Sequence, residues 1–213
     1  MKAFVSMLLL AACTPIVMGS QEQQRHGKSQ EAAESSCPDT HAWTGKYVNY
    51  SYGFSVVIPE GYKGFWNSAV CVAGPDGCTC MSDHGRIIPL TAEPYEPERH
   101  IEVFASYGAD LDELTVKQAV DKRLERIRKR SREGSVSVLK QSTITLAGLR
   151  SQRVLVRYYD EKLNQMMVED FVEAIRRRSV QYSLYLRTTE KAYTHDRSVF
   201  DNVIATFTLR RLE

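Results

Sequence analysis

The chain has 213 residues, of which 43% are hydrophobic and 25% charged, and its formal net charge is +2 at pH 7. A chain of this length suits one domain. The nearly neutral charge gives no support to binding of nucleic acid or of a strongly acidic partner by the protein as a whole. After residue 12, no run is long and apolar enough to span a bilayer.

Residues 1–19 have the pattern of a cleavable secretion signal. Lys2 supplies a positive start, and residues 3–12 form an apolar run that small residues follow. The run is about half of the ~20 residues that a membrane-spanning helix needs, so we expect it to be removed rather than kept as an anchor. The sequence therefore predicts export, which also argues against nucleic acid as a partner.

Two cleavage points compete. The run Leu10-Ala11-Ala12-Cys13 matches a bacterial lipobox, in which Cys13 is lipidated and becomes the mature N-terminus. Alternatively, Val17-Met18-Gly19 suits a general signal peptidase, which would release a chain beginning near Ser20. The first outcome gives a periplasmic or outer-membrane lipoprotein, and the second gives a secreted protein. In both, residues 20–44 are a polar, flexible tether.

Strands are predicted where aromatic and β-branched residues gather, at residues 47–50, 54–58, 86–90 and 101–106. Pro59 ends the second of them, because proline cannot continue a central ladder. Residues 61–85 interrupt this pattern, and we expect an irregular insertion there that holds three of the cysteines.

Four cysteines remain after the signal: Cys37, Cys71, Cys78 and Cys80. An even number in an exported chain indicates two disulfides. A bond between Cys78 and Cys80 would be strained across one residue. Cys37 and Cys71 are therefore each expected to pair with one of Cys78 and Cys80, in an order that the sequence leaves open.

The alternative use of these cysteines is chemical. Cys78 and Cys80, followed by His84, could bind a metal or act as a redox dithiol. Zinc sites usually show two well-spaced pairs of ligands, and here only one cluster exists. No Cys-x-x-Cys motif begins a helix to lower a thiol pKa. We favour disulfides, with no metal and no cofactor.

A helix is predicted over residues 115–133. Thr115 and Gln118 have the spacing of a capping box, and Gly134 is expected to end the helix. Strands then follow at residues 142–146, 153–158, 166–175 and 182–186, and a final helix at residues 198–206. Successive hairpins predict an α/β (α+β) fold, with a central antiparallel sheet and helices covering its faces.

This order resembles the Mog1/PsbP-like family. The residues that carry the resemblance are Tyr52-Gly53-Phe54-Ser55-Val56-Val57-Ile58-Pro59, Leu146-Ala147-Gly148 and Phe200-Asp201-Asn202-Val203-Ile204-Ala205-Thr206-Phe207. The likeness covers residues 45–209 and implies an α/β/α sandwich in a single domain at residues 45–211. It also implies a binding or assembly role rather than catalysis. The insertion at residues 61–85 departs from the family pattern.

Two surfaces could bind a partner. Tyr62, Phe65 and Trp66 are aromatic residues of the kind that anchor interfaces if they are exposed, and are ordinary core if they are buried. The first helix is basic on its predicted outer face, where an acidic partner or anionic lipid headgroups could dock. That face includes Lys117, Lys122, Arg123, Arg126, Arg128, Lys129, Arg130 and Arg132. The alternative is a solvated face that Asp121, Glu125 and Glu133 partly neutralise.

No catalytic residue is predicted. The five histidines are scattered and form no His-Glu-x-x-His motif, and no Gly-x-Ser-x-Gly elbow is present. We therefore expect an exported, non-enzymatic binding or assembly module of the bacterial cell envelope. Its partner would be an envelope protein or the membrane surface. The alternative is a small exported enzyme or a thiol-redox or metal protein that uses Cys78, Cys80 and His84.

Overall fold

The computed structural model describes residues 42–67, 71–74, 77–80, 82–92, 98–107, 114–176 and 180–210. At residues 66, 67, 71–74, 77–80 and 82 it describes the backbone alone. Cys13 and Cys37, the predicted signal and most of the predicted tether lie outside these ranges. No helix among the described residues is long and apolar enough to cross a membrane.

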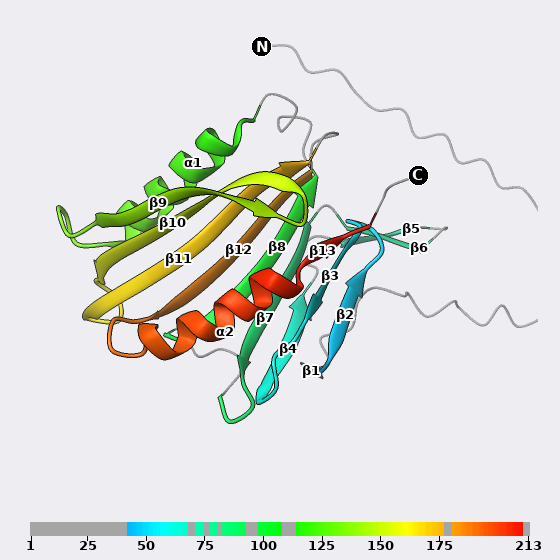
Figure 1. Cartoon of the computed structure of the whole chain (residues 1–213), viewed down its shortest axis with the longest axis horizontal. Coiled ribbons are helices and arrows are strands. Elements are labelled where there is room, and N and C mark those ends of the chain that lie inside the picture. Colours follow the sequence, from blue (N-terminus) through cyan, green and yellow to red (C-terminus); the bar gives the residue numbers. More distant parts are fainter. Residues whose placement is uncertain are drawn as a thin grey trace, which may run out of the picture. The chain divides into compact units, whose positions relative to one another are not determined.

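The main sheet has eight strands in the order β1-β4-β7-β8-β12-β11-β10-β9 (Figure 1). Each strand is antiparallel to its neighbours, which confirms the predicted central antiparallel sheet. The bounds in sheet order are Ala42–Trp43, Tyr62–Asn67, Ser82–Pro89, His100–Tyr107, Val180–Thr189, Gln165–Arg176, Leu149–Asp160 and Ser137–Leu146.

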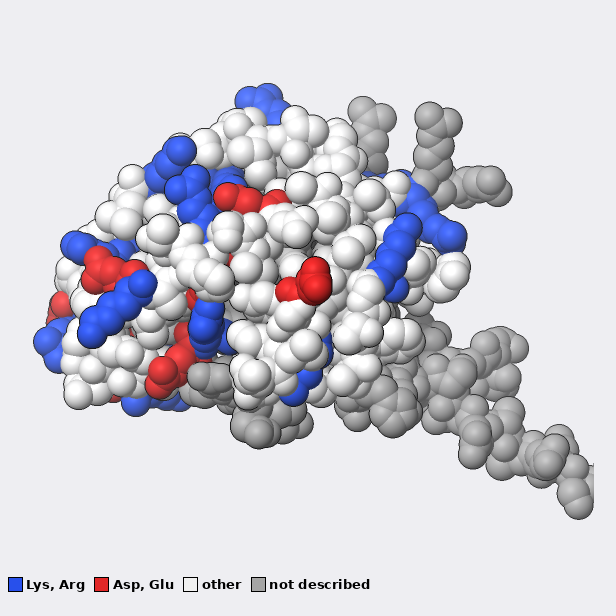
Figure 2. Space-filling view, turned by 60° about the horizontal axis from the view of Figure 1, so that its bottom comes forward, with Lys and Arg blue, Asp and Glu red and all other residues white. Residues whose placement is uncertain are grey.

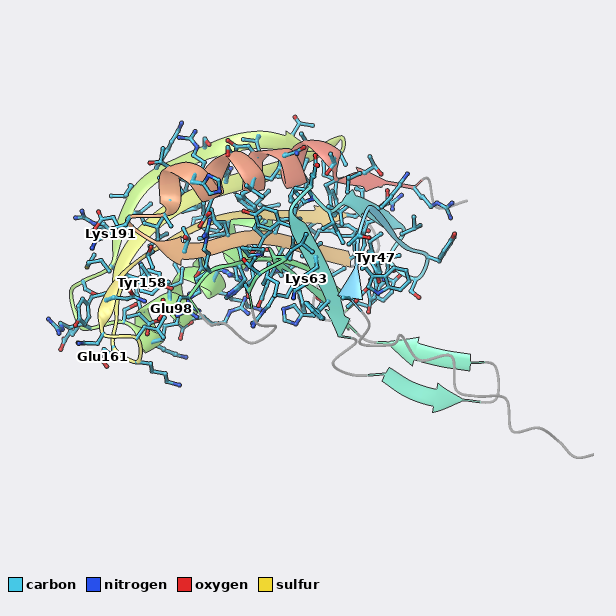
Figure 3. The ribbon with its side chains drawn as sticks, turned by 90° about the horizontal axis from the view of Figure 1, so that it is seen from below. Tyr47, Lys63, Glu98, Tyr158, Glu161 and Lys191 are labelled. Carbon is cyan, nitrogen blue, oxygen red and sulfur yellow. The ribbon has the colours of Figure 1, made fainter. Side chains whose placement is uncertain are left out.

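Two smaller sheets accompany the main one. β2 (Lys46–Asn49), β3 (Phe54–Val57) and β13 (Thr208–Leu209) form the first. β5 (Cys71–Gly74) and β6 (Gly77–Cys80) form the second, a hairpin that projects from the main sheet (Figure 3). All eight strands predicted from the sequence are present, most of them longer than predicted.

The prediction of an irregular insertion over residues 61–85 is wrong. β4 is an integral strand that pairs with both β1 and β7, β5 and β6 form the hairpin, and β7 begins at Ser82. The many glycines and the cysteines of this segment weakened its strand signal. Backbone pairing to neighbouring strands outweighs that local propensity.

α1 (Val116–Arg130) and α2 (Tyr193–Thr206) lie on opposite faces of the main sheet (Figure 3). Side chains of β11 therefore alternate between two cores. Phe171 joins Val120, Leu124 and Ile127 under α1. Its neighbour Val172 joins the larger core under α2 and the β2–β3–β13 sheet. This arrangement confirms the predicted α/β/α layering.

The helix ends differ from those predicted. The capping box of Thr115 and Gln118 is present. However, α1 ends at Arg130, because Ser131 is extended and its hydroxyl donates to the carbonyl of Ile127 at 2.6 Å. Gly134 lies beyond the helix, with a φ of 72°. α2 begins at Tyr193, before the predicted start, and its first turn contains the buried Asp196.

Candidate functional site

A buried layer of charged side chains lies between α1 and the main sheet. Glu169 of β11 is completely buried. Nε of Arg123 donates to one of its carboxylate oxygens at 2.8 Å, and Nη2 of Arg130 donates to the other. Burial alone would raise the pKa of Glu169, but Arg123 and Arg130 outweigh burial and hold that pKa below its ordinary value.

Arg123 is also held by aromatic rings. Its guanidinium carbon lies 3.5 Å from the ring centroid of Tyr185 and 5.5 Å from that of Phe171. Its side chain is 9% exposed. The prediction that Arg123 belongs to the solvent-facing side of the helix is therefore wrong. The Glu169 carboxylate and the Tyr185 ring compensate for the water that the guanidinium loses.

A second carboxyl group follows on the same face of β11. Glu173 is fully buried, and it accepts hydrogen bonds from Nε2 of Gln181 at 2.9 Å and the hydroxyl of Ser183 at 2.8 Å. Burial raises the pKa of Glu173, and Arg123 offsets the rise only in part. Two carboxyl groups on one strand therefore have pKa values displaced in opposite directions.

A third carboxylate, on β8, gathers two histidines and an arginine. We call His84, Arg86, His100 and Glu102 the Glu102 cluster. Nε2 of His84 lies 2.7 Å from one oxygen of Glu102. Nη2 of Arg86 donates to the other oxygen at 2.9 Å, and Nε2 of His100 lies 3.3 Å from that same oxygen. The side chain of Glu102 is 5% exposed, against 31% for His84 and 26% for Arg86.

Within the cluster, charge is fixed by burial and neighbours. Burial would raise the pKa of Glu102, but hydrogen bonding from His84 and the charges of the neighbouring groups lower it to about 2. Burial lowers the pKa of His100 to about 4, so this imidazole is neutral at pH 7. The ring of His100 meets the ring of Tyr185 edge-on, with 6.0 Å between centroids. Polar contacts thus continue from α1 through Tyr185 to β7.

The predicted aromatic anchors do not share one surface. Tyr62 and Phe65 are both half-buried, but an odd separation along β4 places them on opposite faces of the sheet. Tyr62 packs against the core under α2. Phe65 pairs in register with Arg86, which places it on the α1 side with the Glu102 cluster. The side chain of Trp66 lies outside the described residues.

The predicted basic residues of α1 divide into two groups. Arg130 bonds Glu169, and Lys129 forms an exposed ion pair with Glu125 at 2.8 Å. Lys122 and Arg126 are exposed, and neither has an ion pair within the described part of the chain. Arg128 is likewise exposed and has no ion pair among the described residues. We call Lys122, Arg126 and Arg128 the α1 cationic surface.

The surface beyond α1 carries charges of both signs. On the side seen in Figure 2, Lys and Arg lie beside Asp and Glu rather than forming a field of one sign. Recognition of a charged partner would therefore depend on local groups rather than on the net charge of the protein.

No protein-family model matches the sequence, and no curated protein matches it. Among solved structures, cyanobacterial PsbP (CyanoP) from Synechocystis sp. PCC 6803 is 16% identical, with a TM-score of 0.52. The match covers 81% of this chain and 94% of that one. This chain has the Mog1/PsbP-like fold.

Two other solved structures are similar to most of this chain, with lower TM-scores. LpqN of Mycobacterium tuberculosis, described as involved in cell envelope biogenesis, is 9% identical with a TM-score of 0.49, over 80% of this chain and 92% of that one. The Ran-binding protein Mog1p of Saccharomyces cerevisiae is 12% identical with a TM-score of 0.47, over 80% of this chain and 96% of that one. The similarity to CyanoP confirms the Mog1/PsbP-like fold inferred from sequence motifs.

One contact in the structure bears on the alternative function, in which Cys78, Cys80 and His84 act in catalysis, redox chemistry or metal binding. His84 and Glu102 form the hydrogen-bonded pair that orients an imidazole in acid–base catalysis. The described residues contain no group of three His, Cys, Asp or Glu placed to hold a metal ion. The side chains of Cys78 and Cys80 lie outside the description, so their relation to His84 stays a prediction.

The β5–β6 register selects between the two disulfide pairings that the sequence left open. Cys71 stands directly opposite Cys80, and Cys78 stands opposite Ala73. Directly opposed Cα atoms in an antiparallel pair are about 4.5–5.5 Å apart, within the range that a disulfide spans. We predict the pairs Cys71–Cys80 and Cys37–Cys78 in protein purified from an oxidising compartment. Peptide mapping without reduction checks this; a Cys71–Cys78 peptide or four free thiols would contradict it.

The Glu102 cluster predicts acid sensitivity in this Mog1/PsbP-like domain. His100 titrates near 4 when folded and near 6.5 when unfolded. Between these values the unfolded chain binds the proton and the folded chain does not, so stability falls as pH falls. Lowering the pH from 7 to 5 should cost about 2 kcal/mol through this group. Denaturant unfolding at both pH values measures the loss.

The variant His100→Gln removes that titrating group, so its loss of stability between pH 7 and 5 should be smaller than that of the wild type. The exposed His195 offers a matched control, because His195→Gln should retain the wild-type pH dependence. Equal pH dependence in wild type and His100→Gln would show that the burial of His100 does not govern this window.

Proposed function

We propose that this protein is an exported binding module of the bacterial cell envelope, and that it docks an acidic segment of an envelope protein on the α1 cationic surface. The pattern of residues 1–19 supports export. The fold is one that hosts binding proteins, including the Ran-binding Mog1p.

The observation that carries the proposal is the position of Arg126. It projects from α1 between Arg123 and Arg130, and both of those guanidinium groups are committed to Glu169. Partial desolvation and the charge of Arg123 lower the pKa of Arg126, and Glu173 and Glu169 offset this in part. An exposed cation in such a position gains from an added anion, because it has no counterion of its own among the described residues.

The buried layer also makes the surface rigid. Arg123 and Arg130 fix one side of α1 against β11, and Ala119, Val120, Leu124 and Ile127 fill the space beside them. The exposed bases of the helix are therefore presented from a fixed backbone. A preorganised surface loses less conformational entropy when a partner binds.

Site-specific photocrosslinking in intact cells tests this function. A photoreactive residue in place of Lys122 should yield a discrete adduct with one envelope protein, and Arg126→Glu in the same chain should reduce that adduct at least about fivefold, because it reverses a contacting charge. The matched control carries the photoreactive residue in place of Lys191, an exposed lysine in the turn before α2. That control should not give the adduct.

Two results would contradict the proposal. Identical adducts from positions 122 and 191 would show that capture is not specific to α1. The second result has two parts: purified protein binds vesicles of phosphatidylglycerol and phosphatidylcholine, and Lys122→Glu does not. If no protein adduct forms in cells either, the α1 cationic surface binds the membrane instead.

A further inference from the structure

A second candidate binding surface, separate from α1, lies at the edge of the main sheet that β9 forms, opposite the edge formed by β1. β9 is an edge strand, and within the described residues it pairs only with β10 (Figure 1). Nearly all of its side chains are exposed or half-buried. Val138 and Leu139, at its start, are 45% and 52% exposed. The outer N–H and C=O groups of an edge strand are a template for another strand.

The two-residue turn after β9 indicates which N–H groups point outward. Leu146 pairs with Leu149 across Ala147 and Gly148, whose φ values of 47° and 87° suit a type I′ hairpin. Hydrogen-bonded and non-hydrogen-bonded pairs alternate from that closing pair. The alternation makes Gln141, opposite Val154, a non-hydrogen-bonded position. The N–H of Gln141 therefore points away from β10.

A cleft of about 180 Å³ adjoins β9 on the α2 side of the sheet. Three strands and one helix supply its lining: Lys140, Ser142 and Ile144 from β9, Arg153 and Leu155 from β10, Asp170 from β11, and Tyr193 and Arg197 from α2. The cleft therefore combines three cations, one carboxylate and an apolar floor. It opens beside the same strand whose outer edge is unpaired.

The one carboxylate of the lining is already satisfied. Asp170 accepts from Nε and Nη2 of Arg153 at 2.8 and 2.7 Å and from the hydroxyl of Tyr193 at 3.1 Å. Within the described part of the chain, Arg197 has one ion pair, an exposed contact of 3.6 Å with Asp201. Lys140 has no ion pair within the described residues. The cleft thus retains positive charge that faces an incoming ligand.

We propose that β9 binds an extended acidic segment of a protein partner as an added strand, with alternate acidic side chains over the cleft. Main-chain hydrogen bonds to the outer edge of β9 would supply affinity, and Lys140 and Arg197 would select carboxylates. Apolar side chains on the other face of the added strand would meet Val138, which pairs in register with Val156 of the core under α1. This surface is separate from the α1 cationic surface, so the module could hold two segments at once.

Charge argues against a second copy of this chain as the occupant. Antiparallel pairing of two β9 edges would bring a second positive cleft to the same edge. Like charges that face each other across a strand pair are destabilising. A segment with alternating carboxylates has the complementary charge instead.

Fluorescence anisotropy with a labelled decapeptide of alternating Glu and Val tests the proposal on purified protein. The wild type should bind this peptide, and should bind a Lys–Val decapeptide at least about tenfold more weakly. Lys140→Glu should weaken Glu–Val binding about tenfold or more, because it reverses a charge of the cleft. Gln141→Pro should do the same, because it removes an outward N–H while preserving the pairing with β10.

One control separates this surface from the rest of the molecule. Lys46→Glu, on the exposed start of β2, should bind the Glu–Val peptide as the wild type does. Thermal unfolding of each variant verifies its fold. Three results would overturn the proposal. The wild type could fail to bind the Glu–Val peptide, or could prefer the Lys–Val peptide. Alternatively, Lys140→Glu and Gln141→Pro could bind the Glu–Val peptide as tightly as the wild type does. Sedimentation could also show that the wild type is a dimer and that Gln141→Pro is a monomer. This result would overturn the proposal too, because a second copy of the chain would then occupy the edge of β9.

Discussion

The contact of Glu169 with Arg123 and Arg130 is the constraint on which the α1 side of this fold depends. A carboxylate without any exposure remains ionised only when charged donors replace its water. Both guanidinium groups come from α1, about two helical turns apart, so the strand dictates the rotation of the helix about its axis. Apolar packing alone is less directional and would tolerate other rotations.

Fixing that rotation decides what the rest of α1 presents. With Arg123 and Arg130 turned inward, Lys122, Arg126 and Arg128 remain outside without counterions among the described residues. The polar layer then extends through Tyr185 and His100 to the Glu102 cluster. On the opposite face, Arg153 and Tyr193 satisfy Asp170, which leaves Lys140 and Arg197 as the positive side of the β9 cleft. Beneath α1 and beside β9, a buried carboxylate is neutralised by some of the nearby cations. The remaining cations are then able to bind a partner.

Sequence patterns predicted the strands, the capping box and the Mog1/PsbP-like fold, because these depend on local periodicity. They missed β4, whose glycine-containing sequence is a strand only through its neighbours. They also missed the Glu102 cluster and the partners of Glu169, because these depend on which strands lie side by side. Arg123 illustrates the limit: five of the eight residues from 123 to 130 are arginine or lysine, and helical periodicity alone does not show which of them enters the core.

The most direct test of this account is the stability of Glu169→Gln in denaturant unfolding, with the exposed Glu161→Gln as control. Glu169→Gln should lose about 3–5 kcal/mol, since it leaves the buried guanidinium of Arg123 and the partly buried one of Arg130 without a counterion. Arg123→Met should then cost less in the Glu169→Gln background than in the wild type, because the pair is already broken. A loss for Glu169→Gln as small as that for Glu161→Gln would contradict the claim that this buried pair positions α1.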